Sequence, residues 1–181
     1  TILVLELHVP ELENSSFAAF SAGLIQLAPK FFAFLFSFFI IAIFWINHHA
    51  IIHHIHKVDT KLLWLNIGLL FFSSLFPFIT AFIGDYMMNP FVVALYPINM
   101  TLSSVMINAL WKHAFVDSDL ASSTLTAEEK QTRLKRDRMA LLINLGSAAL
   151  AFVWVPITLT IMVVMPFAFV VPEFLANKAE E

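Results

Sequence analysis

Residues 31–56 read FFAFLFSFFIIAIFWINHHAIIHHIH, a stretch without a single Asp, Glu, Lys or Arg. Residues 62–84 and 86–111 also lack all four. About twenty apolar residues, rising 1.5 Å each in a helix, match the roughly 30 Å hydrocarbon core of a bilayer. A soluble core helix rarely stays apolar on every face. The three stretches therefore predict three membrane-spanning helices.

The composition of the whole chain agrees with a membrane protein. Hydrophobic residues make up 60% of its 181 positions and charged residues 13%, and this length indicates one domain. Cysteine is absent, which excludes disulfides, thiolate chemistry and cysteine metal ligands from the sequence given. We expect an all-α, polytopic membrane protein.

The distribution of basic residues predicts the orientation. When the spans are threaded back and forth, every Lys and Arg except Lys30 falls on one side. Loops rich in Lys and Arg face the cytoplasm. We therefore expect both the N-terminus and the C-terminus on the cytoplasmic side.

The threading predicts six spans in one domain, residues 1–175. An apolar run over residues 1–9 exits at Pro10, and a polar loop over residues 8–28 follows. Pro29 suits the first turn of a second span that ends near residue 56. Nine residues are half of what a bilayer requires, so we expect the first half of the first helix to precede Thr1. The third and fourth spans are expected over residues 62–84 and 90–112.

Capping signals place the last two helices. The run TAEE at residues 126–129 is a capping-box pattern that would start the fifth helix in the cytoplasm, after a loop over residues 117–131. Pro156 fits the first turn of a sixth helix that ends near Pro172, before a cytoplasmic tail at residues 176–181.

The uncharged spans exclude several mechanisms. Proton-coupled transporters and intramembrane hydrolases need ionisable groups at membrane depth, and the complete spans carry no carboxylate. Four scattered glycines do not supply paired broken helices, and no TVGYG-like filter is present. A pore filtered by a narrow apolar ring remains physically open.

Three ordered segments resemble one family. TILVLELHVPE at residues 1–11 resembles the second half of the first helix of the transmembrane protein 175 family of potassium channels. FSFFIIAIFWINHH at residues 36–49, followed by Lys57-Val-Asp, is similar to that family's second helix. The segment from Leu63-Trp64 to Pro77 and the Asn89-Pro90 pair continue the match in order.

The resemblance implies a homotetramer in which four first helices line a central pore. It places two hydrophobic constrictions on Ile2 and Leu5, whereas the family's Arg and Phe-Ser-Asp signature and a first constriction would precede Thr1. Ile2, Leu5, Glu6 and Val9 recur at helical steps of three and four. Hydropathy alone would make Ile2 and Leu5 ordinary apolar membrane residues. Glu6, with Val9 at the pore mouth, could attract cations as an acidic ring or simply face headgroups or a neighbouring helix.

Two polar groups in the second span have different interpretations. Trp45, Asn47 and His48 match the family pattern, and the resemblance implies that they bond to the upstream signature and support packing of the pore helix. His49, His53 and His56 fall at helical steps that can bind zinc, but they also lie where polar side chains mark the membrane interface. We favour the interface, with zinc as the weaker alternative.

The leading hypothesis is a potassium-permeable cation channel in the plasma membrane of a prokaryote. It is not an enzyme, needs no cofactor, and interacts with itself, membrane lipids and permeating monovalent cations, not with nucleic acid. The alternatives are a secondary transporter, which couples flux, and a membrane scaffold, which conducts nothing.

Overall fold

The computed structural model describes residues 16–118, 120–121 and 126–178. These residues form helices joined by short links, apart from one antiparallel bridge between Ile55 and Ala121. Their elements, in chain order, are α1 (Phe17–Ile52), α2 (Thr60–Asp85), α3 (Pro90–Lys112), the π-helix η2 (His113–Asp117), α4 (Ala127–Leu150) and α5 (Val155–Lys178). The all-helical prediction is confirmed for this part of the chain.

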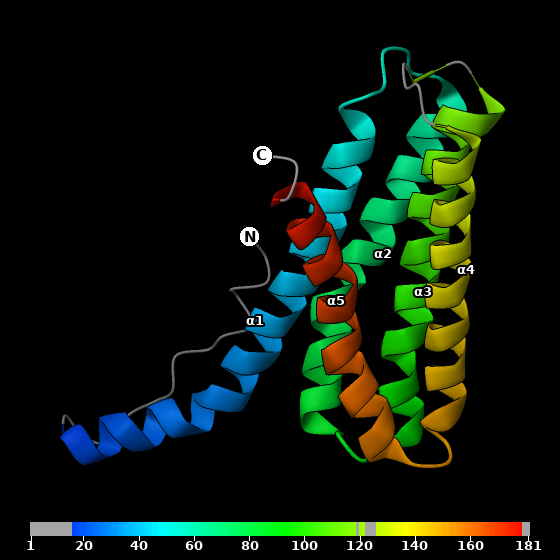
Figure 1. Ribbon diagram of the computed structural model, residues 1–181. Coiled ribbons are helices and arrows are strands. Elements are labelled where there is room, and N and C mark those ends of the chain that lie inside the picture. The colour runs from blue at the N-terminus through cyan, green and yellow to red at the C-terminus, as the bar shows by residue number, and fades with distance from the viewer. Residues whose placement is uncertain (1–15, 119, 122–125, 179–181) are drawn as a thin grey trace.

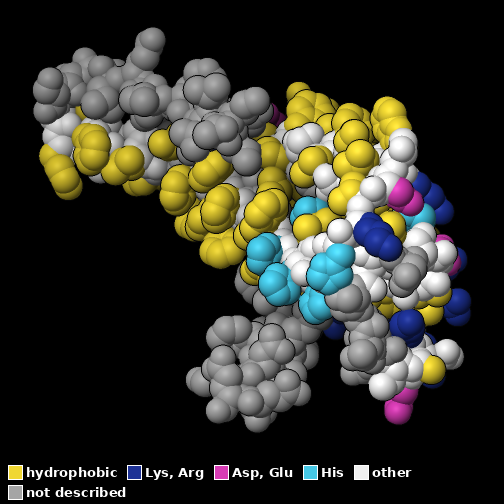
Figure 2. Space-filling view, turned by 90° about the horizontal axis from the view of Figure 1, so that it is seen from above, with side chains coloured by type: hydrophobic (Ala, Val, Ile, Leu, Met, Phe, Trp, Pro, Cys, Tyr) yellow, Lys and Arg dark blue, Asp and Glu magenta, His cyan; other side chains and the backbone are white. Residues whose placement is uncertain are grey.

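The helices α2, α3 and α4 run side by side, and α5 crosses in front of them (Figure 1). The C-terminal half of α1 packs beside α2, whereas its N-terminal part turns away from the bundle. The end of the bundle where α1 ends and α2 begins also holds the start of α4. We call it the basic end, because Lys and Arg side chains gather there together with most of the histidines (Figure 2).

Three described helices are long and apolar enough to cross a membrane, namely residues 30–52, 60–85 and 90–117. They correspond to the expected second, third and fourth spans. The described part of α5 contributes a shorter apolar segment, Val155–Pro166, and α4 carries charge in its first half. These three helices account for three of the six expected spans. The count of six stays a prediction.

Side-chain caps explain why α2 and α3 begin where the sequence predicts. The Asp59 carboxylate accepts the N–H of Leu62 at 2.7 Å. Asn89 Oδ1 accepts from Phe91 at 3.0 Å, and Pro90 occupies the first position of α3, where a missing N–H costs nothing. The helix α4 likewise begins directly after Thr126, as the capping-box pattern predicts.

The predicted loop over residues 8–28 is wrong from Phe17 onward, because α1 begins there and not at Pro29. Ser16 caps the helix by accepting the N–H of Ala19 at 3.2 Å, and the alanines that follow favour helix. Pro29 lies within α1, and a proline inside a helix bends it. The N-terminal part of α1 accordingly turns away from the bundle (Figure 1). The last helix also runs further than expected, past residue 172 to Lys178.

Aromatic packing fills the space between α1, α2 and α3. Phe76 is fully buried, stacks on Phe44 with ring centroids 5.7 Å apart, and meets the Tyr96 ring edge-on at 5.7 Å. Gly68 lets α2 and α3 approach closely, since an added Cβ would lie 2.8 Å from Met106 Sδ. The interior of this three-helix unit is thus occupied by side chains.

Candidate functional site

The four predicted pore positions, Ile2, Leu5, Glu6 and Val9, lie outside the described residues. The candidate functional residues that the structure describes lie at and near the basic end of the bundle. They include the predicted trio on α1, Trp45, Asn47 and His48, and polar side chains on α2, α3 and α4.

The three residues of the predicted trio on α1 have different surroundings. Trp45 is 61% exposed, and its ring lies 5.8 Å from that of His48. Asn47 donates to the carbonyl of Ile43 in its own helix at 3.1 Å and lines a cavity. His48 Nε2 lies 2.7 Å from Asn66 Oδ1 of α2. His48 therefore joins α1 to α2.

Asn66 is a partner that the sequence analysis missed. It is half-buried on α2, in a span that is otherwise strongly apolar. A polar amide within an apolar span requires a partner, since lipid offers none. This rule predicts that Asn66 has a hydrogen-bond partner. Only the packing of α1 on α2 identifies that partner as His48.

We predict measurable coupling between His48 and Asn66. Interhelical hydrogen bonds in membrane proteins contribute about 0.6 kcal/mol on average and up to about 1.7. A double-mutant cycle with His48→Leu and Asn66→Leu, read by unfolding in detergent, should give a coupling free energy in this range. His49→Leu is the matched control, because His49 is exposed on the next position of α1. Coupling of Asn66 to His49 as strong as to His48 would contradict the assigned bond.

The predicted histidine face is only partly formed. The rings of His49 and His53 lie 6.4 Å apart, but α1 ends at Ile52, so His56 is outside the helix and the expected helical step to it is wrong. The backbone N–H of His56 instead donates to the carbonyl of Leu120 at 2.9 Å. Within the described ranges, no three His, Cys, Asp or Glu side chains are grouped to hold a metal ion.

A second polar contact at the basic end joins the α1–α2 link to η2. His113 is buried, and its Nε2 donates to Asp59 Oδ2 at 2.8 Å. Ser118 Oγ lies 3.2 Å from the other ring nitrogen. The N–H of Leu62 and then the imidazole of His113 stabilise the Asp59 carboxylate, so the pKa of Asp59 lies below its ordinary value of 3.8.

We predict that Asp59→Asn lowers stability in a pH-dependent way. Because the folded pKa is depressed, the carboxylate stabilises the fold above its ordinary value, and this contribution is lost as pH falls through the lowered pKa. In thermal unfolding in detergent, the melting temperatures of the wild type and Asp59→Asn should differ near neutral pH and become equal in acid. Asp85→Asn, at the exposed far end of α2, is the control. A difference in melting temperature that stays constant into strong acid would contradict the stabilising role of the Asp59 carboxylate.

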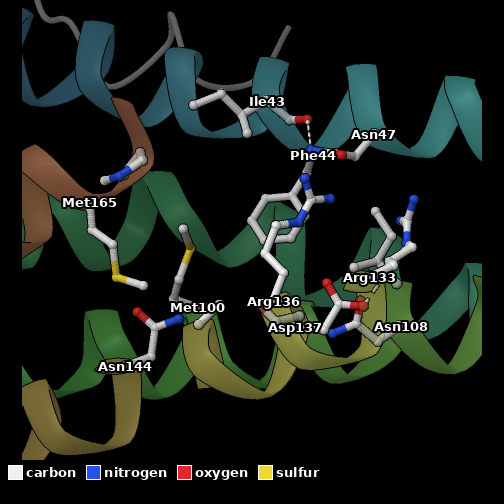
Figure 3. Close-up of a pocket in the computed structure, with 14 residues that line it drawn as sticks. Ile43, Phe44, Asn47, Met100, Asn108, Arg133, Arg136, Asp137, Asn144 and Met165 are labelled. Carbon is white, nitrogen blue, oxygen red and sulfur yellow. Dashed lines mark hydrogen bonds and ion pairs between the residues drawn. The ribbon is translucent and has the colours of Figure 1, made fainter. Parts of the chain in front are cut away.

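A cavity of about 110 Å³ lies in the half of the bundle nearer the basic end. Side chains of α1, α3, α4 and the middle of α5 line it (Figure 3). On α4, Arg133 Nε lies 3.9 Å from Asp137 Oδ2, and the Arg133 guanidinium stands 5.0 Å above the buried Trp111 ring. The sequence analysis used these α4 charges only to predict the orientation, because Trp111, the α3 partner of Arg133, is far away in sequence.

Long apolar helices, a filled aromatic core and polar contacts collected at one end define a polytopic helical membrane protein. Residues 1–77 match the family described as endosomal/lysosomal potassium channel TMEM175. A potassium channel of Streptomyces collinus is 30% identical over 166 residues, covering 88% of this chain and 78% of that protein. The chain belongs to the TMEM175 family.

Further relatives agree with this assignment. A potassium channel of Chryseobacterium sp. is 42% identical over 107 residues, which span 58% of this chain and about half, 52%, of that protein. One of Chamaesiphon minutus is 29% identical over 173 residues, covering 93% of this chain and 85% of that protein. The crystal structure of a lysosomal potassium-selective channel TMEM175 homolog from Chamaesiphon minutus has a TM-score of 0.75 at 27% identity, covering 94% of this chain and 88% of that one.

Proposed function

We propose that the protein is a potassium-permeable cation channel and not an enzyme. The observation that carries the proposal is the likeness over nearly the whole chain to a TMEM175 homolog described as potassium-selective. Relatives named as potassium channels support the same activity. Conduction requires no cofactor, because the permeating ion is itself the substrate.

The pore of this channel would lie between copies of the chain. Phe44, Phe76 and Tyr96 fill the space between α1, α2 and α3, so an ion path there would require the core to unpack. The outer faces of the same helices are apolar and exposed, as at Phe39, Ile46 and Phe78. In a membrane such faces contact lipid or another copy. We propose a homotetramer around a central pore.

We predict a tetramer as the stable species in mild detergent. One first helix cannot enclose an ion path, whereas four copies supply four such helices. Native mass spectrometry of the purified protein gives the number of subunits directly. A monomer or dimer as the only stable species would contradict the proposed pore.

The narrowest part of the pore is assigned to Ile2 and Leu5, four copies of each. A ring of branched apolar side chains admits water poorly and so can gate and filter ions. Glu6 and Val9 follow on the same helical face and would form the mouth, where carboxylates raise the local concentration of cations. The assignment rests on the family resemblance and on helical periodicity.

The polar residues on α1 would support the pore helix and not contact the ion. The bond of His48 to Asn66 supports a packing role, since it fixes α1 against α2. Trp45 is exposed on the outer face of α1 and is available to a neighbouring helix or to lipid. Bacterial relatives and the collection of basic residues favour a prokaryotic plasma membrane with this end in the cytoplasm.

An ion-flux assay with purified protein in liposomes tests the proposed function. A channel passes potassium down its gradient without a coupled ion, whereas a secondary transporter requires the second ion and a scaffold passes none. Potassium-loaded vesicles diluted into sodium buffer should lose potassium rapidly once a charge-balancing ionophore is added. Flux that requires a sodium or proton gradient would support the transporter, and no flux at all the scaffold.

A further inference from the structure

The cavity between α1 and α4 is charged at one end and carries two methionines at the other. Figure 3 shows Asn47, Asn108 and Arg133 gathered toward one end, and Met100, Asn144 and Met165 toward the other. Since α1 and α3 run toward the basic end, Asn47 and Asn108 lie near it, only one to two turns before their helices finish at Ile52 and Lys112. The methionines lie deeper in the bundle. Charge therefore decreases from the basic end inward, as it does in a membrane leaflet from the headgroups to the acyl chains.

The positive charge of the cavity exceeds its negative charge. Arg133 and Arg136 line it against one carboxylate, Asp137. Asp137 and the Trp111 ring hold Arg133 in place. The Arg136 side chain rises from α4 across the cavity toward Asn47 of α1. Two guanidinium groups and the amides of Asn47 and Asn108 thus converge from three helices on one small space.

A lining with two guanidinium groups and one carboxylate suits an anionic ligand. Arg133 is the seventh residue of α4, about 9 Å from its start at 1.5 Å per residue. Guanidinium groups bind phosphate with paired, charge-assisted hydrogen bonds, and amides add further donors. Basic pockets between membrane helices on the cytoplasmic side are a recurrent binding site for anionic headgroups. A single water needs only about 10–15 Å³ of cavity volume on the same measure, so the cavity of about 110 Å³ has room for a phosphate group.

We propose that this cavity binds the phosphate of an anionic phospholipid from the leaflet at the basic end of the bundle. Arg136 and the amides of Asn47 and Asn108 contact the phosphate, while Arg133, fixed by Asp137, adds charge from the side. The acyl chains leave past the methionine end, along Met100 and Met165. A phospholipid fits better than free phosphate, because Met100 and Met165 offer apolar contacts that an acyl chain can use and a free anion cannot. The lipid would join α1 to α4 independently of ion conduction.

Native mass spectrometry of the complete protein tests this site with two lipids. Purified protein is delipidated and then titrated with phosphatidylglycerol or with phosphatidylcholine, and the bound fraction is measured. The wild type should retain phosphatidylglycerol preferentially. Arg136→Gln should weaken that binding about tenfold, the effect of losing one charge-assisted contact. Arg138→Gln, an exposed position on the same helix with the same change of charge, should bind as the wild type does.

The controls keep the outcome decisive. The wild-type comparison of the two lipids needs no variant, so a misfolded Arg136→Gln protein would not obscure it. Equal retention of both lipids, or equal losses in Arg136→Gln and Arg138→Gln, would overturn the proposal. A third titration uses inorganic phosphate. If phosphate alone displaces phosphatidylglycerol at similar concentrations, the site binds a free anion and the lipid assignment is wrong.

Discussion

Shortening Leu5 or Ile2 to Ala is expected to raise the basal cation current about tenfold, which corresponds to a barrier about 1.4 kcal/mol lower. In the proposed pore, a partly dehydrated ion passes an apolar neck that offers no replacement ligands, so the barrier depends on side-chain size and polarity. Leu5→Asn should raise the current too, because its amide oxygen replaces lost hydration. The Ala variants should also discriminate less between potassium and sodium, since a wider neck lets each ion keep more water. Single-channel recording measures both effects.

Leu7→Ala is the matched control for these variants. It makes the same chemical change two residues further along, which places it on a different face of a helix. Its conductance and reversal potential should equal those of the wild type. If Ile2→Ala, Leu5→Ala and Leu5→Asn all behave like Leu7→Ala, the first helix does not form the constriction.

Phe76→Ala should destabilise the fold by about 3 to 5 kcal/mol. The Phe76 side chain is fully buried between the rings of Phe44 and Tyr96, so its removal leaves a cavity. In a membrane the loss is mainly one of packing contacts, because lipid is as apolar as the core. Unfolding in mixed detergent micelles measures the difference.

Phe78→Ala tests the same substitution on the outside of the same helix. Phe78 is 60% exposed and stacks on Phe82, one turn further along α2. The expected change is below about 1 kcal/mol, as for other surface positions. Similar losses for the two variants would mean that the interior between α1, α2 and α3 is not the packed unit described above.

The sequence predicts α2 and α3 well because their signals are local. Charge-free stretches fix their extent, and Asp59 and Asn89 mark their first turns by capping. The start of α1 was missed because the polar residues before Phe17 and the proline at position 29 were interpreted as one loop. A capping serine followed by alanines was the contrary signal. The π-helix η2 has no sequence pattern that distinguishes it from the end of α3.

The contacts of the candidate site could be predicted only in part. Trp45, Asn47 and His48 stand out as polar or amphipathic groups in an apolar span, which predicts that they need partners. Which partner each takes depends on how helices pack, and no local pattern encodes the bond of His48 to Asn66. The cavity beside Arg136 is likewise lined by α1, α3, α4 and α5, so no local pattern in the sequence encodes it.

Recording from the purified wild-type protein in a planar bilayer tests the central claim most directly. With potassium on one side and sodium on the other, a potassium-permeable channel gives discrete unitary currents that reverse at a potential favouring potassium. The proposed tetramer predicts such steps with no coupled ion present. A membrane that stays silent, or a smooth current that vanishes without a second coupled ion, would contradict the proposed channel.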